Sequence, residues 1–234
     1  MITPFYTQAN EQIVFSREQA SNFAKQVADD FNPLHDVDAK RFCVPGDLLF
    51  AITLAKAGIY KNMEFTFSGM VTDNIALNFP NHIENSAIVT DDNEKEYLQV
   101  SADGEKTTNE PFIEALTKAY VEFSGHTFPH ILVKLMAEHD VMINPARPMV
   151  MYERMSITLD SFEADNITLE TDHNTLSIDG KRGNVCLAFN LKSNDKIIGH
   201  GKKYMMLSGL RPYCANTMTS VVDEYKEVKR AYAQ

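Results

Sequence analysis

A short segment near the N-terminus carries a carboxyl group and an imidazole ring at a spacing that suits proton transfer. The sequence Asp30-Phe31-Asn32-Pro33-Leu34-His35 places Asp30 and His35 on either side of an Asn-Pro turn. Pro33 fixes one backbone angle, and the side-chain amide of Asn32 can hold the turn. Such a turn can direct both ionisable side chains at one water molecule, which predicts general acid–base chemistry.

The same segment also suits a purely structural role, because Asp and Asn beside Pro commonly cap free backbone N–H groups where a helix ends. Taken alone, it favours that interpretation, and the elements around it shift the balance. A capping box at 16–19 followed by apolar residues at helical spacing predicts a helix over 17–29. Pro45 and Gly46 then open a second helix, apolar on nearly every side, that ends at Gly58.

The segment resembles the D-x-N-P-x-H signature of the R-specific enoyl-CoA hydratases, which form the MaoC-like branch of the hot-dog superfamily. The resemblance covers residues 14–55 and includes the helix before the motif and the run Val44-Pro45-Gly46 before the apolar helix. It implies that Asp30 and His35 are the catalytic pair. It also implies that the N–H of Gly46, at the positive end of the helix dipole, is the oxyanion donor. The substrate-binding residues implied by the resemblance are Asn32, Phe42 and Pro45.

The segment also departs from that signature. Pro45 stands where the family usually has His, and Asp47 follows the helix-opening Gly46. An acidic residue is favourable at a helix N-terminus, but its charge opposes an enolate held there. The run Val44-Pro45-Gly46 is more similar to the start of the central helix in acyl-carrier-protein dehydratases of the same superfamily.

The order of elements predicts a duplicated α+β fold. Strands are expected at 63–68, 75–79, 87–90 and 97–100, and 101–111 has the polar composition of a linker. The second half of the chain then repeats this order. It has an expected helix at 112–123, an apolar helix that opens at Pro129, and expected strands at 151–159, 167–178, 184–191 and 197–207. With the resemblance, this predicts a double hot-dog in which two antiparallel curved sheets each wrap a central apolar helix.

The predicted domains are an N-terminal hot-dog half at 1–105 carrying the motif, a C-terminal half at 106–215 lacking it, and a C-terminal helix at 216–234. The second half has Ser124-Gly125-His126 near the corresponding place. These residues are interpreted as a helix cap and polar loop rather than a second catalytic site. Lys202 and Lys203 could receive coenzyme A phosphates, although solvated strand residues are the favoured interpretation.

Composition narrows the function classes further. Lys plus Arg is 22 and Asp plus Glu is 32, so a formal net charge of −10 argues against a nucleic-acid partner or an anionic membrane surface. The 3 cysteines have no metal-like spacing and suit reduced thiols, and no apolar run is long enough to span a bilayer. We therefore expect a cytoplasmic protein with no metal and no cofactor beyond the coenzyme A of its substrate.

These observations favour an acyl-thioester enzyme, a lyase of fatty acid metabolism that reversibly hydrates 2-enoyl-CoA or dehydrates 3-hydroxyacyl-CoA through Asp30 and His35. A thioester hydrolase, in which a carboxylate directs water at the carbonyl carbon, is an alternative within the same fold. A non-catalytic protein that binds acyl-CoA or lipid is an alternative from another class. The thioester partner is acyl-CoA or an acyl-carrier protein, and a duplicated chain suits a monomer that forms its own pseudo-dimer or a homodimer.

Overall fold

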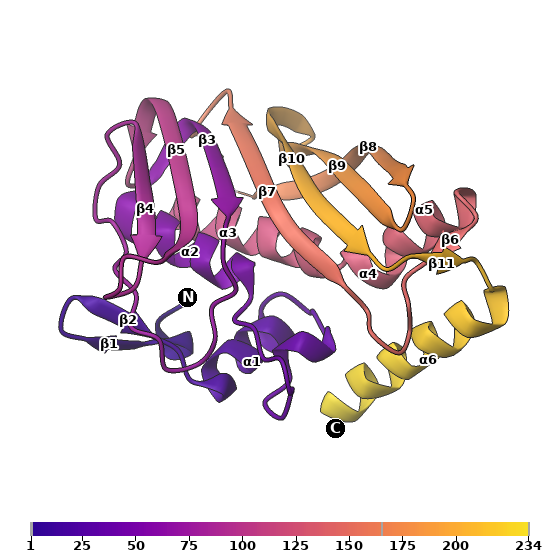
Figure 1. The fold of residues 1–234 in the computed structure, drawn as a ribbon. Coiled ribbons are helices and arrows are strands. Elements are labelled where there is room, and N and C mark those ends of the chain that lie inside the picture. Colours follow the sequence, from indigo (N-terminus) through magenta and orange to yellow (C-terminus); the bar gives the residue numbers. More distant parts are fainter. Residues whose placement is uncertain (1, 165, 234) are drawn as a thin grey trace.

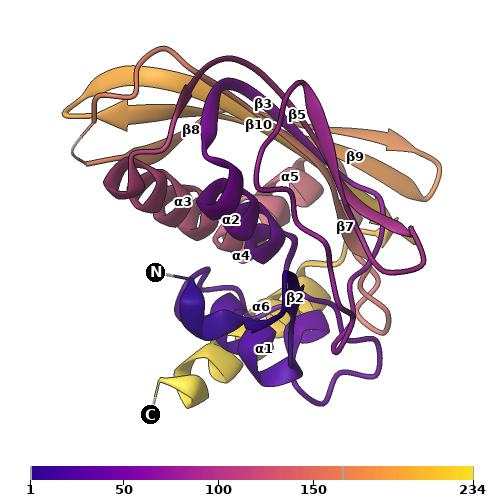
Figure 2. The same ribbon diagram turned by 90° about the vertical axis from the view of Figure 1, so that its left-hand side faces the viewer.

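The computed structural model describes residues 2–164 and 166–233. One large antiparallel sheet of 7 strands, in the order β4-β5-β3-β7-β10-β9-β8, forms one layer of the molecule. Helices α2 and α3 lie side by side against one face of the curved sheet, and α1 and α6 lie beyond them (Figures 1 and 2). The architecture is therefore α+β, with the helices on one side of an antiparallel sheet.

The helices are η1 (Thr3–Phe5), α1 (Arg17–Gln26), η2 (Pro33–His35), α2 (Gly46–Ala57), α3 (Glu110–Gly125), α4 (Thr127–His130), α5 (Leu132–Glu138) and α6 (Ala215–Tyr232). The strands outside the large sheet are β1 (Thr7–Ala9), β2 (Gln12–Val14), β6 (Val141–Met142) and β11 (Arg211–Pro212). The strands of the large sheet are β3 (Ile59–Phe67), β4 (Ser86–Thr90), β5 (Glu96–Thr107), β7 (Val150–Leu159), β8 (Thr168–Asp179), β9 (Arg182–Ser193) and β10 (Lys196–Ser208).

The two predicted sheets are in fact one, which corrects the sequence-based expectation. Strand β3 pairs antiparallel with β7, from Asn62 opposite Thr158 to Thr66 opposite Arg154. This seam joins β4-β5-β3 to β7-β10-β9-β8, so β4 and β8 are the edge strands of the large sheet in the described part of the chain. Pairing two strands that would otherwise be edges satisfies their backbone N–H and C=O groups.

Helix α2 forms as its composition predicts, because an apolar helix without a polar face must be buried on all sides. All of its side chains from Asp47 to Leu54 are buried, and it ends at Gly58, whose φ of +83° suits glycine. Its neighbour is α3 and not the helix expected to open at Pro129. That stretch forms the short helices α4 and α5, and a non-helical backbone conformation at Phe128, with φ −109° and ψ 135°, interrupts the helical path just before Pro129.

Two further segments differ from the expectation. The predicted linker at 101–111 is largely strand, because β5 continues to Thr107 along β3 before Asn109 caps α3. Its polar side chains face solvent on one side of an antiparallel sheet. A polar composition of this kind is also typical of a loop, which is why the sequence predicted a linker here. The predicted strand at 75–79 forms only isolated bridges, from Leu77 to Ile13 and from Asn78 to Thr90. The predicted domain boundary at 105 falls inside β5.

The four predicted C-terminal strands are confirmed as β7 to β10 with small shifts at their ends. The tight turn between β9 and β10 is made by Asn194 and Asp195, at φ +48° and +64°, the conformation of a hairpin turn that follows the sheet twist. Along β9, buried residues alternate with more exposed ones, so one face of this hairpin packs inward.

The apolar interior has two adjoining clusters. The larger surrounds α2 and extends to β3, β5 and the start of α3, and the smaller lies between α5, β9, β10 and Met218 of α6. Helix α6 confirms the expected C-terminal helix and crosses beneath the motif segment, where Tyr225 and Tyr232 pack edge-on against Phe31. Within the described ranges, none of the helices is both long and apolar enough to cross a membrane.

Candidate functional site

The motif segment begins where α1 ends. The capping box predicted at the start of α1 is present, with Ser16 and Gln19 bonded to each other's backbone N–H. After the helix, the backbone turns sharply at Asp29, whose φ is +54°. The N–H of Asp30 donates to the carbonyl of Ala24 at 2.8 Å, so the Asp30 backbone is fixed to the end of the helix.

The turn itself is held by side-chain hydrogen bonds, as the sequence predicted. The N–H of Asn32 donates to Oδ1 of Asp30 at 2.9 Å, and Oδ1 of Asn32 accepts from the N–H of Leu34 at 3.1 Å. Pro33 begins the short helix η2, which ends at His35. Asn32 thus caps η2, and one oxygen of Asp30 is committed to holding the turn.

Asp30 and His35 lie together. Oδ2 of Asp30 is 3.7 Å from Nε2 of His35, and their side chains are 26% and 12% exposed. Nδ1 of His35 lies 2.7 Å from the carbonyl oxygen of Cys43, which can only accept, so Nδ1 carries a hydrogen. The ring is therefore oriented with Nε2 toward the carboxylate, and a separation too long for a direct hydrogen bond leaves the two groups able to share a water.

The other predicted substrate-binding residues are placed differently. Phe42 is 2% exposed and lies in the core beneath the Arg17 guanidinium, which is 5.0 Å from the ring centroid. Pro45 is also buried, immediately before α2. These positions give both residues a role in supporting the loop between η2 and α2.

Gly46 opens α2 as predicted, but its surroundings explain the glycine in another way. A Cβ atom at this position would lie 3.0 Å from Cε1 of Phe67 and 3.2 Å from Cδ1 of Tyr152. The two rings stack at a centroid distance of 4.3 Å. Glycine therefore allows the start of α2 to pack against β3 and β7.

Asp47 belongs to a buried polar cluster that the sequence did not reveal. Its side chain, 8% exposed, accepts a hydrogen bond at Oδ2 from Oγ of Ser124 at 2.5 Å. Nζ of Lys203, 5% exposed, donates to the same Ser124 Oγ at 2.5 Å and to the Ser124 carbonyl at 3.4 Å. We call Asp47, Ser124 and Lys203 the inner cluster. It joins α2, α3 and β10.

Burial sets the titration of this cluster. Desolvation raises the pKa of Asp47 although the charge of Lys203 and the hydrogen bond from Ser124 oppose the shift. Desolvation also lowers the pKa of Lys203 against the attraction of Asp47 and of Asp30. The charges of Asp30 and His35 act on the pKa of Asp47, so the motif pair and the inner cluster share one electrostatic environment.

Two tyrosine hydroxyls complete the polar interior beside this cluster. Tyr120 of α3 and Tyr152 of β7 share a hydrogen bond, and the Nζ of Lys203 lies 4.5 Å from the centroid of the Tyr152 ring. Burial raises the pKa of both phenols well above the ordinary value, so both hydroxyls stay neutral. Lys203 is thus enclosed by an aromatic face, a serine and a carboxylate.

A second group of charges adjoins the motif on its more exposed side. Oδ2 of Asp29 is 2.8 Å from Nε2 of His126 and also accepts from Lys229 of α6. Partial burial acts to raise the pKa of Asp29, but the hydrogen bonds and charges of Lys229 and His126 hold it below its usual value. We call Asp29, His126 and Lys229 the outer cluster.

Gly125 lets α3 reach both clusters. A Cβ atom on Gly125 would lie 1.7 Å from the carbonyl oxygen of Ala28, so only glycine permits this contact between α3 and the backbone after α1. The contact sets Ser124 and His126 beside the motif segment. The sequence interpretation of Ser124 as a helix cap is therefore corrected: Ser124 lies inside α3 and bonds to Asp47.

Lys203 was also placed wrongly by the sequence interpretation, which favoured a solvated residue. It lies on β10 with Met205 and Leu207 at alternate positions, all of them buried. The period-two pattern of that strand is the signal that would have placed the Lys203 side chain inside.

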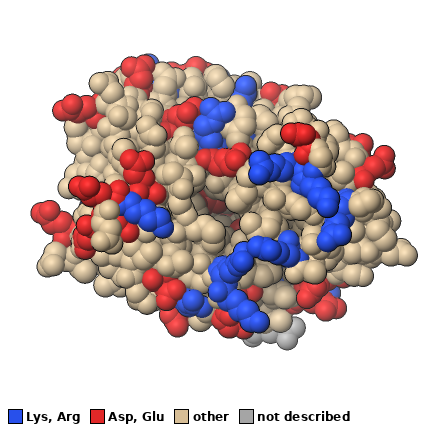
Figure 3. All heavy atoms as spheres, in the orientation of Figure 1, with Lys and Arg blue, Asp and Glu red and all other residues tan. Residues whose placement is uncertain are grey.

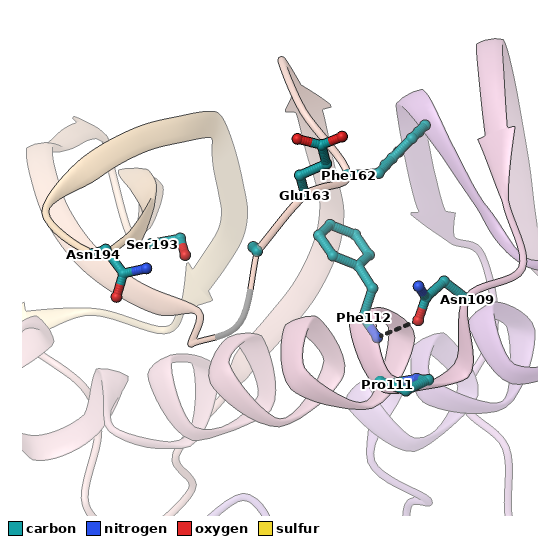
Figure 4. Close-up of a pocket in the computed structure, with 8 residues that line it drawn as sticks. Asn109, Pro111, Phe112, Phe162, Glu163, Ser193 and Asn194 are labelled. Carbon is teal, nitrogen blue, oxygen red and sulfur yellow. Dashed lines mark hydrogen bonds between the residues drawn. The ribbon is translucent and has the colours of Figure 1, made fainter.

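A separate cavity of about 440 Å³ lies at the other end of α3 (Figure 4). Its lining includes Asn109 and Phe112 at the start of α3, Phe162 in the β7–β8 connection and Ser193 at the β9–β10 turn. The rise of an α-helix puts this cavity about 20 Å from Ser124. Throughout 2–164 and 166–233, no group of three or more His, Cys, Asp or Glu residues is arranged to hold a metal ion.

A family model described as Protein of unknown function (DUF3581) matches residues 1–216. The chain belongs to this family. The match includes the motif segment and the inner cluster, and it ends within the first turn of α6. A search of curated protein sequences finds no match.

Several solved structures are similar in fold to this DUF3581 chain. The tesB protein of Mycobacterium avium subspecies paratuberculosis is similar at a TM-score of 0.50 and 8% identity, over 88% of this chain and 97% of that one. Acyl-CoA thioesterase II TesB2 from Mycobacterium marinum is similar at a TM-score of 0.43 and 6% identity, over 73% of this chain and 90% of that one. A MaoC-like dehydratase is similar at a TM-score of 0.45 and 10% identity, over 87% of this chain and 97% of that one. The likeness to the tesB protein, at a TM-score of 0.50, shows that the two chains share a fold.

Proposed function

We propose that this protein is an acyl-thioester enzyme that reversibly adds water to a 2-enoyl thioester. The observation that carries the proposal is the pairing of Asp30 with His35 at 3.7 Å, with the ring held by the Cys43 carbonyl so that Nε2 faces the carboxylate. Two proton-transfer groups able to share one water are what hydration at Cβ requires.

Three groups carry out the proposed reaction: Asp30, His35 and the backbone N–H of Gly46. The Asp30–His35 pair takes a proton from water as its oxygen bonds to Cβ, and returns a proton to Cα. The N–H of Gly46, at the start of α2, stabilises the negative charge that develops on the thioester oxygen. The Asp47 charge next to Gly46 would oppose that enolate, but the buried ammonium of Lys203 offsets it within the inner cluster.

The proposal includes the finer fold assignment. We interpret the molecule as a double hot-dog of the MaoC-like branch. Helix α2 with β3 to β5 forms the motif-bearing half, which ends with β5 at Thr107, and α3 with β7 to β10 forms the other half, which ends with β10 at Ser208. The C-terminal helix α6, Ala215–Tyr232, is added to these two halves. The β3–β7 seam is the internal equivalent of a dimer interface, which supports a monomer with one site.

The surface supports a substrate that carries phosphate groups, as coenzyme A and the acyl-carrier-protein arm do. On the face shown in Figure 3, Lys and Arg side chains gather to the right of and below a hollow near the middle, and Asp and Glu side chains lie above it. Positive charge concentrated beside a hollow attracts a phosphorylated substrate even though the net charge is −10.

A thioester hydrolase is the second candidate. It is favoured by Asp47, a second carboxylate directly after Gly46, because a carboxylate close to the thioester carbonyl could direct water at the carbonyl carbon. Hydration and hydrolysis differ in product: hydration removes the conjugated double bond and retains the thioester, whereas hydrolysis releases a free thiol.

The test incubates the protein with trans-2-enoyl-CoA substrates of several chain lengths and follows enone absorbance and free thiol in parallel. We expect absorbance to fall without thiol release, and Asp30→Asn to lower kcat by about 10²- to 10⁴-fold. Asp36→Asn is the matched control, because Asp36 directly follows His35 but pairs with Lys25 at 2.8 Å. Thiol release would identify the hydrolase. No change in either signal with folded protein would contradict both reactions.

A further inference from the structure

One oxygen of the inner cluster is left without a partner. Oδ1 of Asp47 is buried and accepts no hydrogen bond from any described residue. An ionised carboxylate can accept about four hydrogen bonds. Leaving a buried carboxylate oxygen without a donor costs more free energy than leaving a buried neutral acceptor without one. A buried carboxylate oxygen therefore calls for a donor that the described chain does not supply.

The rest of the cluster fixes that oxygen in place. Oδ2 of Asp47 is bound by Ser124, and Ser124 is in turn bound by Lys203 through two hydrogen bonds. These contacts come from α3 and β10, so the carboxylate cannot turn to exchange its two oxygens without breaking them. The cluster holds one oxygen and presents the other.

The position of Asp47 distinguishes it from the other buried side chains that lack a partner. Thr117, Thr127 and Asn174 are the others among the described residues, and all three are neutral. Asp47 directly follows Gly46, and the charges of Asp30 and His35 both reach it. Oδ1 of Asp47 therefore belongs to the residue next to the proposed oxyanion donor, and its carboxyl group is electrostatically coupled to the proton-transfer pair.

We propose that Oδ1 of Asp47 accepts a hydrogen bond from the 3-hydroxyl group of a 3-hydroxyacyl thioester, and from the attacking water in the reverse direction. This inference rests on the proposed function, because hydration makes and dehydration consumes that hydroxyl. Asp47 thereby selects 3-hydroxyacyl over saturated acyl thioesters. Ser124 and Lys203 act as positioning residues that hold the carboxylate.

The test measures binding without turnover. Asp30→Asn protein is titrated by calorimetry with (3R)-3-hydroxyacyl-CoA and with saturated acyl-CoA of equal chain length. We expect a preference of about tenfold or more for the hydroxylated compound, the gain from one hydrogen bond to a charged acceptor. In the Asp30→Asn, Asp47→Asn double variant, the affinities for the hydroxylated and the saturated compound should become nearly equal. The affinity for the saturated compound should be retained.

Thr117→Val in the Asp30→Asn background is the matched control, because it removes another buried hydroxyl of α3 that lacks a partner. It should leave the preference unchanged. Equal preference with and without Asp47 would overturn the inference even if wild-type protein hydrates enoyl-CoA. An Asp47-dependent preference in a protein that shows no hydration would instead support the inference and contradict the reaction. Failure to bind either compound would overturn the inference.

Discussion

The inner and outer clusters each combine an aspartate with a lysine, and the two clusters behave differently. Each has an aspartate near the motif, a residue from the end of α3 and a lysine from later in the chain. The inner cluster is buried, and desolvation shifts the pKa of Asp47 up and that of Lys203 down. The outer cluster is half exposed, and its cations lower the pKa of Asp29.

The contrast shows how burial changes what a cluster of an aspartate and a lysine does, alongside the different third group, Ser124 or His126. A half-exposed pair contributes little to stability because water already solvates both charges. A buried pair holds its charges in place at an energetic penalty, and breaking it is strongly unfavourable because the partner is left unpaired. The inner cluster is therefore suited to hold a reactive arrangement, and the outer cluster to attach α6.

The sharpest test of this contrast is Lys203→Met. Removing the buried cation leaves Asp47 unpaired, so the free energy of unfolding should fall by about 3–5 kcal/mol. Urea unfolding measures it. In the Asp47→Asn, Lys203→Met double variant no buried charge remains, and stability should return to within about 1 kcal/mol of wild type. Strictly additive losses in the double variant would contradict a coupled pair.

Gly125→Ala should disturb both clusters together. The new Cβ would overlap the Ala28 carbonyl oxygen, so α3 must move away from the motif segment. We expect a loss of about 3 kcal/mol in unfolding free energy, the upper end of the range for an overpacked contact. Gly180→Ala is the control, because nothing lies within 4 Å of that site and only its φ of +57° is strained. A smaller loss for Gly125 than for Gly180 would contradict the close contact.

Asp29→Asn tests the outer cluster and should have the smallest effect, at most about 1 kcal/mol at neutral pH. Asn tolerates the positive φ of this position, so the change removes charge alone. The lowered pKa of Asp29 means that its contribution is complete above the usual value of 3.8 and is lost as pH falls through the lower folded-state pKa. Chemical unfolding of both proteins from pH 7 to pH 3 should show the difference shrink once the pH falls below 3.8. A difference that grows in acid would contradict this assignment.

Local features of the site could be predicted from the sequence. The capping box, the Asn-Pro turn and the helix opening at Gly46 each depend on residues close together in the chain, so their types and spacing determine the geometry. This is why the proximity of Asp30 to His35 and the bounds of α2 followed from the sequence.

The inner cluster could not be predicted in the same way, since its members are 77 and 79 residues apart. Only the strand pattern around Lys203 and the lone acid in an otherwise apolar helix pointed to it. The single sheet was missed because the β3–β7 pairing joins strands from opposite halves. The strand after Val100 was missed because its solvent-facing residues resemble a linker.

Helix α6 gives the molecule an order of assembly. Phe31, inside the motif, is covered by Tyr225 and Tyr232, and the N–H of Phe31 donates to the Tyr225 hydroxyl at 3.3 Å. Synthesis on the ribosome proceeds from the N-terminus, so these tyrosines emerge about 200 residues after the segment they cover, at roughly 5–20 residues per second. For roughly ten seconds or more, the nascent motif must wait for its last covering element or be shielded by a chaperone.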